Sequence, residues 1–129
     1  MDRTRFIDHQ GQRLLLLDYT NLGTDLDQLK AEIERSKAVI AHEPPGSVLT
    51  VTDVRGSKIT PGAVKAMQEL VQFNAPYVRW SAVVVGLTGV YLTAFRAIQA
   101  LSRRRNLRAF NDMDEAKDWL LSHVPAGVG

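Results

Sequence analysis

The sequence of 129 residues contains no cysteine, which excludes disulfide bridges, thiolate zinc sites and cysteine nucleophiles. An excess of charge of one sign is also missing, because 16 Lys and Arg residues against 14 Asp and Glu leave a formal net charge of only +2. The longest uncharged run, Trp80–Phe95, is shorter than the roughly 20 residues that a membrane helix needs. The first ten residues lack the apolar segment of a secretory signal. We therefore expect a protein of the reducing cytoplasm with no membrane span and no strong attraction to nucleic acid.

What is present is an ordinary globular composition. Hydrophobic residues make up 45% of the chain and charged residues 23%, as in a folded domain with a single core. No internal repeat, low-complexity segment or linker divides the sequence. We expect one domain over residues 1–129, with residues 124–129 as a frayed tail.

The first half of the chain predicts a hairpin, a helix and a strand. Thr4–His9 and Gln12–Asp18 are extended runs on either side of a turn at Gln10-Gly11. Thr24 is the predicted cap of a helix that ends before two prolines. Its apolar positions are Leu22, Leu26, Leu29, Ile33 and Ile40, and its polar positions include Lys30, Glu32, Glu34 and Arg35. Ser47–Asp53 then predicts a third, buried strand.

The second half alternates helices and strands. Thr60 and Pro61 predict the start of a second helix, with a buried stripe of Val64, Met67, Leu70 and Val71. Trp80–Leu87 predicts a fourth strand, and a third helix follows from Gly89. Leu107–Phe110 is a short fifth strand, and Asp112 caps a last helix that packs Ala116, Trp119 and Leu120 on the sheet. The order ββαβαβαβα predicts an α/β fold, whose mostly parallel five-stranded sheet carries an antiparallel N-terminal hairpin.

Four segments carry a family resemblance that spans nearly the whole chain: Leu49–Gly56, Asn74–Val78, Ala82–Gly89 and Asp114–Leu120. With the element order, they resemble the STAS domains of anti-sigma factor antagonists. The chain looks most like the SpoIIAA-like group, also described as STAS/SEC14-like bacterial proteins. The resemblance implies a scaffold with a protein-binding face and carries over no catalytic residue.

One departure from that family is specific. Antagonists of the family have an Asp-Ser-Ser-Gly-like turn after the third strand, and a partner kinase phosphorylates the second serine. Asp53 and Gly56 match the ends of this motif, whereas Val54 and Arg55 stand where the serines would be. Neither side chain accepts phosphate, so the phosphorylation switch is in doubt while a binding role remains.

The candidate binding surface lies where the third and fourth strands end, because such ends adjoin in a parallel sheet. A helix N-terminus there, reinforced by Arg55 and Lys58, suits an anion. The alternative interpretation is a capped turn with a positive φ at Gly56 and solvated basic side chains. The candidate binding residues are Asp53, Arg55, Gly56, Ser57, Lys58, Thr88 and Gly89.

One basic cluster follows, made of Arg96, Arg103, Arg104, Arg105 and Arg108. Positive charge at a helix C-terminus compensates the helix dipole and favours solubility. The alternative is an anionic partner, such as an acidic protein face or phospholipid head groups. A nucleic-acid partner is disfavoured, because the nearby aromatic residues are better explained by packing against the sheet.

No constellation predicts catalysis or a metal site. His9, His42 and His123 are isolated from one another in the sequence, and none lies at i, i+4 spacing with another ligand residue. The leading hypothesis is a non-catalytic regulatory module that binds an unidentified protein, with no cofactor. The alternative is a carrier of a small anionic or lipid ligand. Its SEC14-like pocket would lie at the C-terminal ends of the strands, lined by the third and fourth helices, with Arg55, Lys58 or Thr88 at its mouth. Edge strands and the last helix make a homodimer possible.

Overall fold

The structure, a computed structural model, describes residues 2–22, 25–57, 60–85 and 106–123 of the chain. Its elements are β1 (Thr4–His9), β2 (Gln12–Asp18), α1 (Leu26–Ile40), β3 (Val48–Asp53), α2 (Pro61–Asn74), β4 (Val78–Val84), β5 (Leu107–Phe110) and α4 (Met113–Ser122). The strands form one sheet in the order β1-β2-β3-β4-β5, antiparallel between β1 and β2 and parallel elsewhere. The predicted α/β fold with an N-terminal hairpin is confirmed. The helix expected from Gly89 lies outside the described residues.

The hairpin between β1 and β2 turns over two residues. Gln10 and Gly11 both have positive φ, 53° and 84°, as a type I′ turn requires. The Asp8 carboxylate accepts a hydrogen bond of 2.8 Å from the Gly11 backbone N–H. This turn sets the register in which Thr4 lies opposite Leu17 and His9 opposite Gln12.

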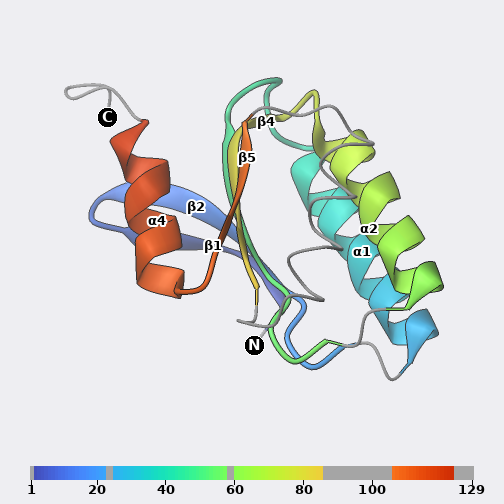
Figure 1. Cartoon of the computed structure of the whole chain (residues 1–129). Helices are drawn as coiled ribbons and strands as arrows, with labels where there is room; N and C mark the ends of the chain where they lie inside the picture. Colours follow the sequence, from blue (N-terminus) through green and yellow to red (C-terminus); the bar gives the residue numbers. More distant parts are fainter. Residues whose placement is uncertain (1, 23–24, 58–59, 86–105, 124–129) are drawn as a thin grey trace.

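Helices cover both faces of the sheet (Figure 1), with α1 and α2 on one face and α4 on the other. Because side chains alternate along a strand, Leu15 and Leu17 join the core under α1 and α2. Leu14 and Leu16 join the core under α4. Double burial explains why β2 is continuously apolar from Leu14 to Leu17.

Two of the three predicted helix caps are correct. The Thr60 hydroxyl accepts from the Ala63 N–H at 3.1 Å, and the Asp112 carboxylate accepts from the Glu115 N–H at 2.9 Å. At α1 the N-cap is Asp25, whose carboxylate accepts from Asp27 N–H and Gln28 N–H. The prediction of Thr24 was wrong by one residue. A carboxylate at the N-cap also interacts favourably with the helix dipole.

The buried face of α2 and the start of β4 also differ from the prediction. The residues of α2 that are fully buried are Ala63, Ala66, Leu70 and Asn74, whereas Val64, Met67 and Val71 are half-buried. The buried stripe is therefore rotated by about one residue, because α2 packs beside α1 as well as on the sheet. Strand β4 begins at Val78 rather than Trp80, since Val78 pairs with Val48 across an irregularity that skips Arg79.

A buried polar cluster joins α1 to the hairpin. Glu32, one of the polar positions of the predicted helix, is buried and accepts a hydrogen bond of 2.8 Å from the Thr4 hydroxyl. Its other oxygen accepts from Arg35 Nε and Nη2 at 3.0 and 2.9 Å. The Ser36 hydroxyl contacts both the Thr4 and Tyr19 hydroxyls, at 2.7 and 2.6 Å. Burial raises the pKa of the Tyr19 phenol well above its ordinary value of 10.0.

Candidate functional site

The candidate site lies at the edge of the sheet where the parallel strands end. Asp53, the last residue of β3, is paired with Asp18 of β2 on one side and with Val84 of β4 on the other. The Asp53 carbonyl accepts from Tyr19 N–H at 2.8 Å, and Val54 N–H donates to the Val84 carbonyl at 3.0 Å. The turn that follows β3 is therefore anchored to the ends of both neighbouring strands.

Asp53 and Arg55 form an ion pair within this turn. Arg55 Nε and Nη2 donate to the two carboxylate oxygens of Asp53 at 3.0 and 2.8 Å, and the Arg55 backbone N–H donates at 3.1 Å. The Asp53 side chain is 6% exposed and that of Arg55 is 46% exposed. The hydrogen bond to Asp53 raises the pKa of Arg55 further, and Asp112 and Asp18 add to this by charge. The guanidinium is therefore charged and fixed in direction, and nearly half of the Arg55 side chain faces solvent.

Gly56 allows the turn to close against the loop that follows β2. Its φ is +76°, the positive value that one interpretation of the sequence predicted. A Cβ atom built at this position would overlap with Asn21 Oδ1 and lie 3.1 Å from Asn21 Cγ. Asn21 itself has a positive φ of 56° and donates its backbone N–H to the Arg55 carbonyl at 3.1 Å.

Ser57 joins the same two loops through its side chain. Its hydroxyl donates to the Tyr19 carbonyl and accepts from the Leu22 N–H at 3.1 Å. The hydroxyl proton and one lone pair of Ser57 are thus engaged by the backbone. This arrangement fits a structural clamp better than a nucleophile or a readily phosphorylated group.

Charge at this edge differs from the expected anion crevice. Arg55 is close enough to Asp18, Asp53 and Asp112 for all three to act on its pKa. Asp18 is also 3.7 Å from Arg3. Burial acts to raise the pKa of Asp18, but hydrogen bonds from the Thr20 hydroxyl and N–H, with Arg3 and Arg5, lower it overall. Among the described residues, three acidic groups therefore act on three basic ones, which leaves no excess of positive charge at this edge.

The structure brings together four of the predicted binding residues, Asp53, Arg55, Gly56 and Ser57. Lys58, Thr88 and Gly89 lie outside the described residues, as do Arg96, Arg103, Arg104 and Arg105 of the basic cluster. Arg108, its remaining member, is exposed on β5 with its guanidinium 5.3 Å from the centre of the Phe110 ring. The structure therefore tests neither interpretation of that cluster.

Sequence reasoning missed the loop after β2. Tyr19, Asn21 and Leu22 contribute the groups that hold the Asp53–Ser57 turn. The available signal was Asn21, since asparagine is one of the few residues that readily adopt a positive φ. Its pairing with Gly56 depends on how the two loops meet, which local sequence does not encode.

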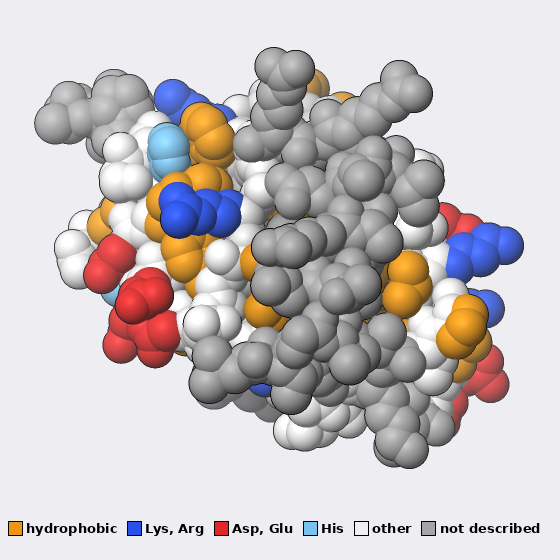
Figure 2. Space-filling model, in the orientation of Figure 1, with side chains coloured by type: hydrophobic (Ala, Val, Ile, Leu, Met, Phe, Trp, Pro, Cys, Tyr) orange, Lys and Arg blue, Asp and Glu red, His pale blue; other side chains and the backbone are white. Residues whose placement is uncertain are grey.

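Aromatic side chains gather around α4. Trp119 lies 5.7 Å from Trp80 and 5.4 Å from Phe110, and His123 stacks on Trp80 at 4.0 Å between ring centres. Trp119 packs on the sheet as expected and stays partly exposed. In Figure 2, hydrophobic side chains group around a histidine and a basic side chain at the upper left, on the α4 side.

The described residues contain no group of three His, Asp or Glu side chains that could hold a metal ion. His9 is hydrogen-bonded to Asp118 at 3.0 Å, and His42 contacts the Ala38 carbonyl at 2.7 Å. In the same part of the chain, no helix has the length and apolar character to cross a membrane. The chain matched no protein-family model, no curated protein and no solved structure.

Proposed function

We propose that the chain is a non-catalytic regulatory module of the cytoplasm, related to the anti-sigma factor antagonists, which binds another protein through the Asp53–Ser57 turn. The observation that carries the proposal is the preorganisation of this turn. Its backbone is hydrogen-bonded to the ends of β2 and β4, and it presents a half-exposed Arg55 in a fixed direction. A surface that is rigid before binding loses little entropy when a partner docks.

Binding is favoured over catalysis by the state of the polar groups. The Asp53 carboxylate is buried under Arg55, and the Ser57 hydroxyl is engaged by two backbone groups. A general base or a nucleophile has to reach a substrate atom with its reactive oxygen. The exposed edge of Arg55 offers donors instead, which suit carboxylate or carbonyl acceptors on a partner.

The proposed binding is constitutive rather than switched by phosphate. Val54 and Arg55 replace the two serines of the related motif, and Val54 is half-buried against the core. Phosphorylation acts by adding negative charge and acceptor oxygens. Here Arg55, paired with Asp53, stands at the position of the phosphorylated serine, and Val54 stands at the other. A kinase therefore has no acceptor at either serine position.

Affinity capture from the native host tests this proposal, with the protein carrying Arg55→Gln compared with the unmodified chain. The matched control is Arg35→Gln, because Arg35 also pairs with a buried carboxylate and also reaches solvent. We expect a partner whose affinity falls about tenfold or more with Arg55→Gln, as for a central interface arginine, and is unchanged with Arg35→Gln. The measurement is a titration of the purified partner against each variant.

Equal binding by the Arg55→Gln and unmodified chains would place the partner surface elsewhere. Native mass spectrometry of the same preparations separates the carrier hypothesis, because a carrier retains a small mass. The third helix, expected to line the pocket of such a carrier, lies outside the described residues, so that hypothesis stays a prediction.

A further inference from the structure

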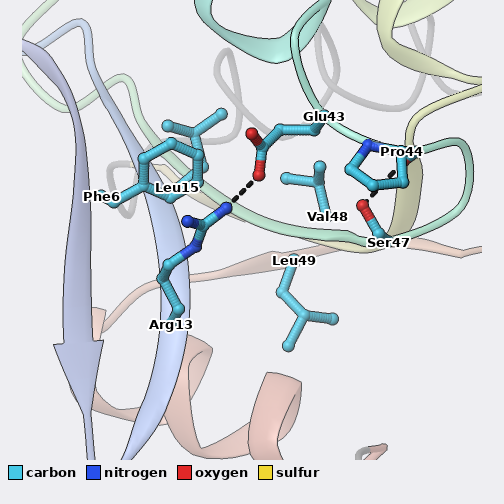
Figure 3. Close-up of a pocket in the computed structure, with 8 residues that line it drawn as sticks. All are labelled: Phe6, Arg13, Leu15, Glu43, Pro44, Ser47, Val48 and Leu49. Atoms are coloured by element: carbon cyan, nitrogen blue, oxygen red, sulfur yellow. Dashed lines mark hydrogen bonds and ion pairs between the residues drawn. The ribbon is translucent and has the colours of Figure 1, made fainter.

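A small pocket lies at the other edge of the sheet, where β3 begins (Figure 3). Its volume is about 210 Å³, and its inner wall is formed by Phe6, Leu15 and Val48. Leu15 and Val48 belong to the core between the sheet and helices α1 and α2. The pocket is remote along β3 from the Asp53–Ser57 turn, so a ligand here would not compete with a partner at that turn.

Two opposite charges face each other across this pocket. Arg13 of β2 and Glu43 of the loop after α1 form an ion pair through Nη2 and Oε1, and Figure 3 shows the two side chains pointing toward one another. The Arg13 guanidinium lies 3.8 Å from the centre of the Phe6 ring. The Glu43 side chain is 17% exposed and that of Arg13 is 60% exposed. The Phe6 ring and the half-buried Glu43 carboxylate therefore hold the Arg13 guanidinium at the rim of the pocket.

The ion pair leaves hydrogen-bonding capacity on both groups. A guanidinium has five N–H donors and a carboxylate has two acceptor oxygens. Within the described part of the chain, Arg13 Nε and Nη1 and Glu43 Oε2 have no hydrogen-bond partner. A ligand that carries one negative and one positive group can therefore bind both side chains while they remain paired.

The size of the pocket limits the rest of the ligand. A cavity of roughly 150 Å³ accommodates benzene, and pockets for drug-sized molecules begin at about 300 Å³. A volume of about 210 Å³ therefore admits one ring or one branched aliphatic group. It is too small for a lipid chain.

We propose that this pocket binds a free hydrophobic α-amino acid. The ligand carboxylate receives hydrogen bonds from Arg13, its ammonium group donates to Glu43, and its side chain contacts Phe6, Leu15 and Val48. An α-amino acid carries both charges on one carbon, which matches two rim groups that already touch. The proposal does not depend on the protein partner proposed above.

Methyl NMR titration of the full chain with L-leucine tests the proposal, with Leu15 and Val48 as reporters. We expect saturable shifts with a dissociation constant of about 1 mM, typical of a small ligand with few contacts. 4-Methylpentanoate lacks the ammonium group and isoamylamine lacks the carboxylate, so each should bind at least about tenfold more weakly. Absence of L-leucine binding, or equal binding of 4-methylpentanoate, would overturn the proposal.

Substitutions of Arg13 and Glu43 test the binding role proposed for each of these two residues. Arg13→Gln and Glu43→Gln should each weaken L-leucine binding about tenfold, as expected for loss of one charged hydrogen bond. Their matched controls, Arg79→Gln and Glu69→Gln, change exposed residues outside the pocket and should leave binding unchanged. Unchanged binding in both rim variants would refute the assignment. If a variant does not fold, the comparison of L-leucine with its two analogues on the unmodified chain still tests the proposal.

Discussion

Two carboxylates in this molecule are buried to the same degree, and each is held by an arginine two or three residues further along the chain. Glu32 lies on α1 and pairs with Arg35, whereas Asp53 ends β3 and pairs with Arg55. The side chain of Arg35 is 65% exposed and that of Arg55 is 46% exposed. The difference is in the second partner: Glu32 also accepts from the buried Thr4 hydroxyl, whereas Asp53 accepts from the backbone of its own turn.

This difference separates an interaction that assembles the fold from one that shapes a surface. Glu32, Thr4 and Ser36 connect α1 with β1, residues about 30 positions apart in the sequence. Removal of the Glu32 side chain would take away the charged acceptor of the buried Thr4 hydroxyl. Asp53 and Arg55 lie two residues apart, so their pair organises one turn and directs one guanidinium outward. The same pair of residue types thus serves the core in one place and the proposed binding surface in the other.

The largest expected effect is that of Glu32→Ala. The substitution removes a buried acceptor and leaves a cavity beneath α1, so we expect the free energy of unfolding to fall by about 3 kcal/mol. Asp53→Ala should lower it by only about 1–2 kcal/mol, because water can solvate the half-exposed Arg55 it leaves behind. Urea unfolding followed by Trp80 and Trp119 fluorescence measures both.

Glu34→Ala is the control for this comparison, since Glu34 is an exposed neighbour on the same helix and should change stability by less than about 0.5 kcal/mol. An Asp53→Ala variant as destabilised as Glu32→Ala would contradict the distinction between the two pairs. It would show that the turn supports the whole domain.

Gly56→Ala should have the next largest effect, and Gly11→Ala is its matched control. Both glycines have positive φ, but a Cβ at Gly11 meets no atom within 4 Å, whereas one at Gly56 overlaps with Asn21. We expect a loss of about 1 kcal/mol for Gly11→Ala from backbone strain alone, and about 1 kcal/mol more for Gly56→Ala. Adding Asn21→Gly to Gly56→Ala should recover the difference, because glycine removes the overlapping side chain and tolerates the positive φ of this position. Equal losses for the two glycine variants would mean that the loops are not packed as described.

Asp18→Asn should have the smallest effect, confined to acid. The pKa of Asp18 is lowered below its ordinary value of 3.8 in the folded chain. Its ionised form therefore stabilises the fold above that value, and this contribution is lost as the pH falls through the folded-state pKa. The unfolding free energy of Asp18→Asn, measured by urea titration, should consequently decrease less between pH 5 and pH 2 than that of the unmodified chain. The difference should be of order a few tenths of a kcal/mol, since the Asp18 side chain is 30% exposed and water screens its interactions. An identical pH dependence of the two chains would mean that the interactions of Asp18 with Thr20 and Arg3 do not stabilise the fold.

The elements and their order were predictable because their signals are local. The bounds of β1, β2 and β5 agree with the prediction residue for residue, since a two-residue turn and alternating or continuous apolar runs define them. The caps at Thr60 and Asp112 follow from side chains that reach the next turn. The cap of α1 was misplaced because Thr24 and Asp25 are both good capping residues, and only the folded helix start distinguishes between them.

The candidate site was predictable in place and only partly in structure. The end of β3 and the positive φ of Gly56 follow from the strand–turn pattern around Asp53. One interpretation of the sequence predicted a solvated Arg55 and the other an anion-binding Arg55. Neither predicted its bidentate ion pair with Asp53. The pocket at Arg13 and Glu43 had no signal at all, because its two charges come from elements 30 residues apart.

The amino-acid sequence by itself determined the α/β class, the hairpin and the alternation of strands and helices, because hydrophobic period, turn residues and capping residues act over a few positions. Only the tertiary structure decided which polar side chains are buried and which charges meet. Glu32 and Lys30 look alike in the helical pattern, yet one is buried under Thr4 and the other is exposed. Burial and pairing depend on elements distant in sequence that pack together, and that information exists only once the chain has folded.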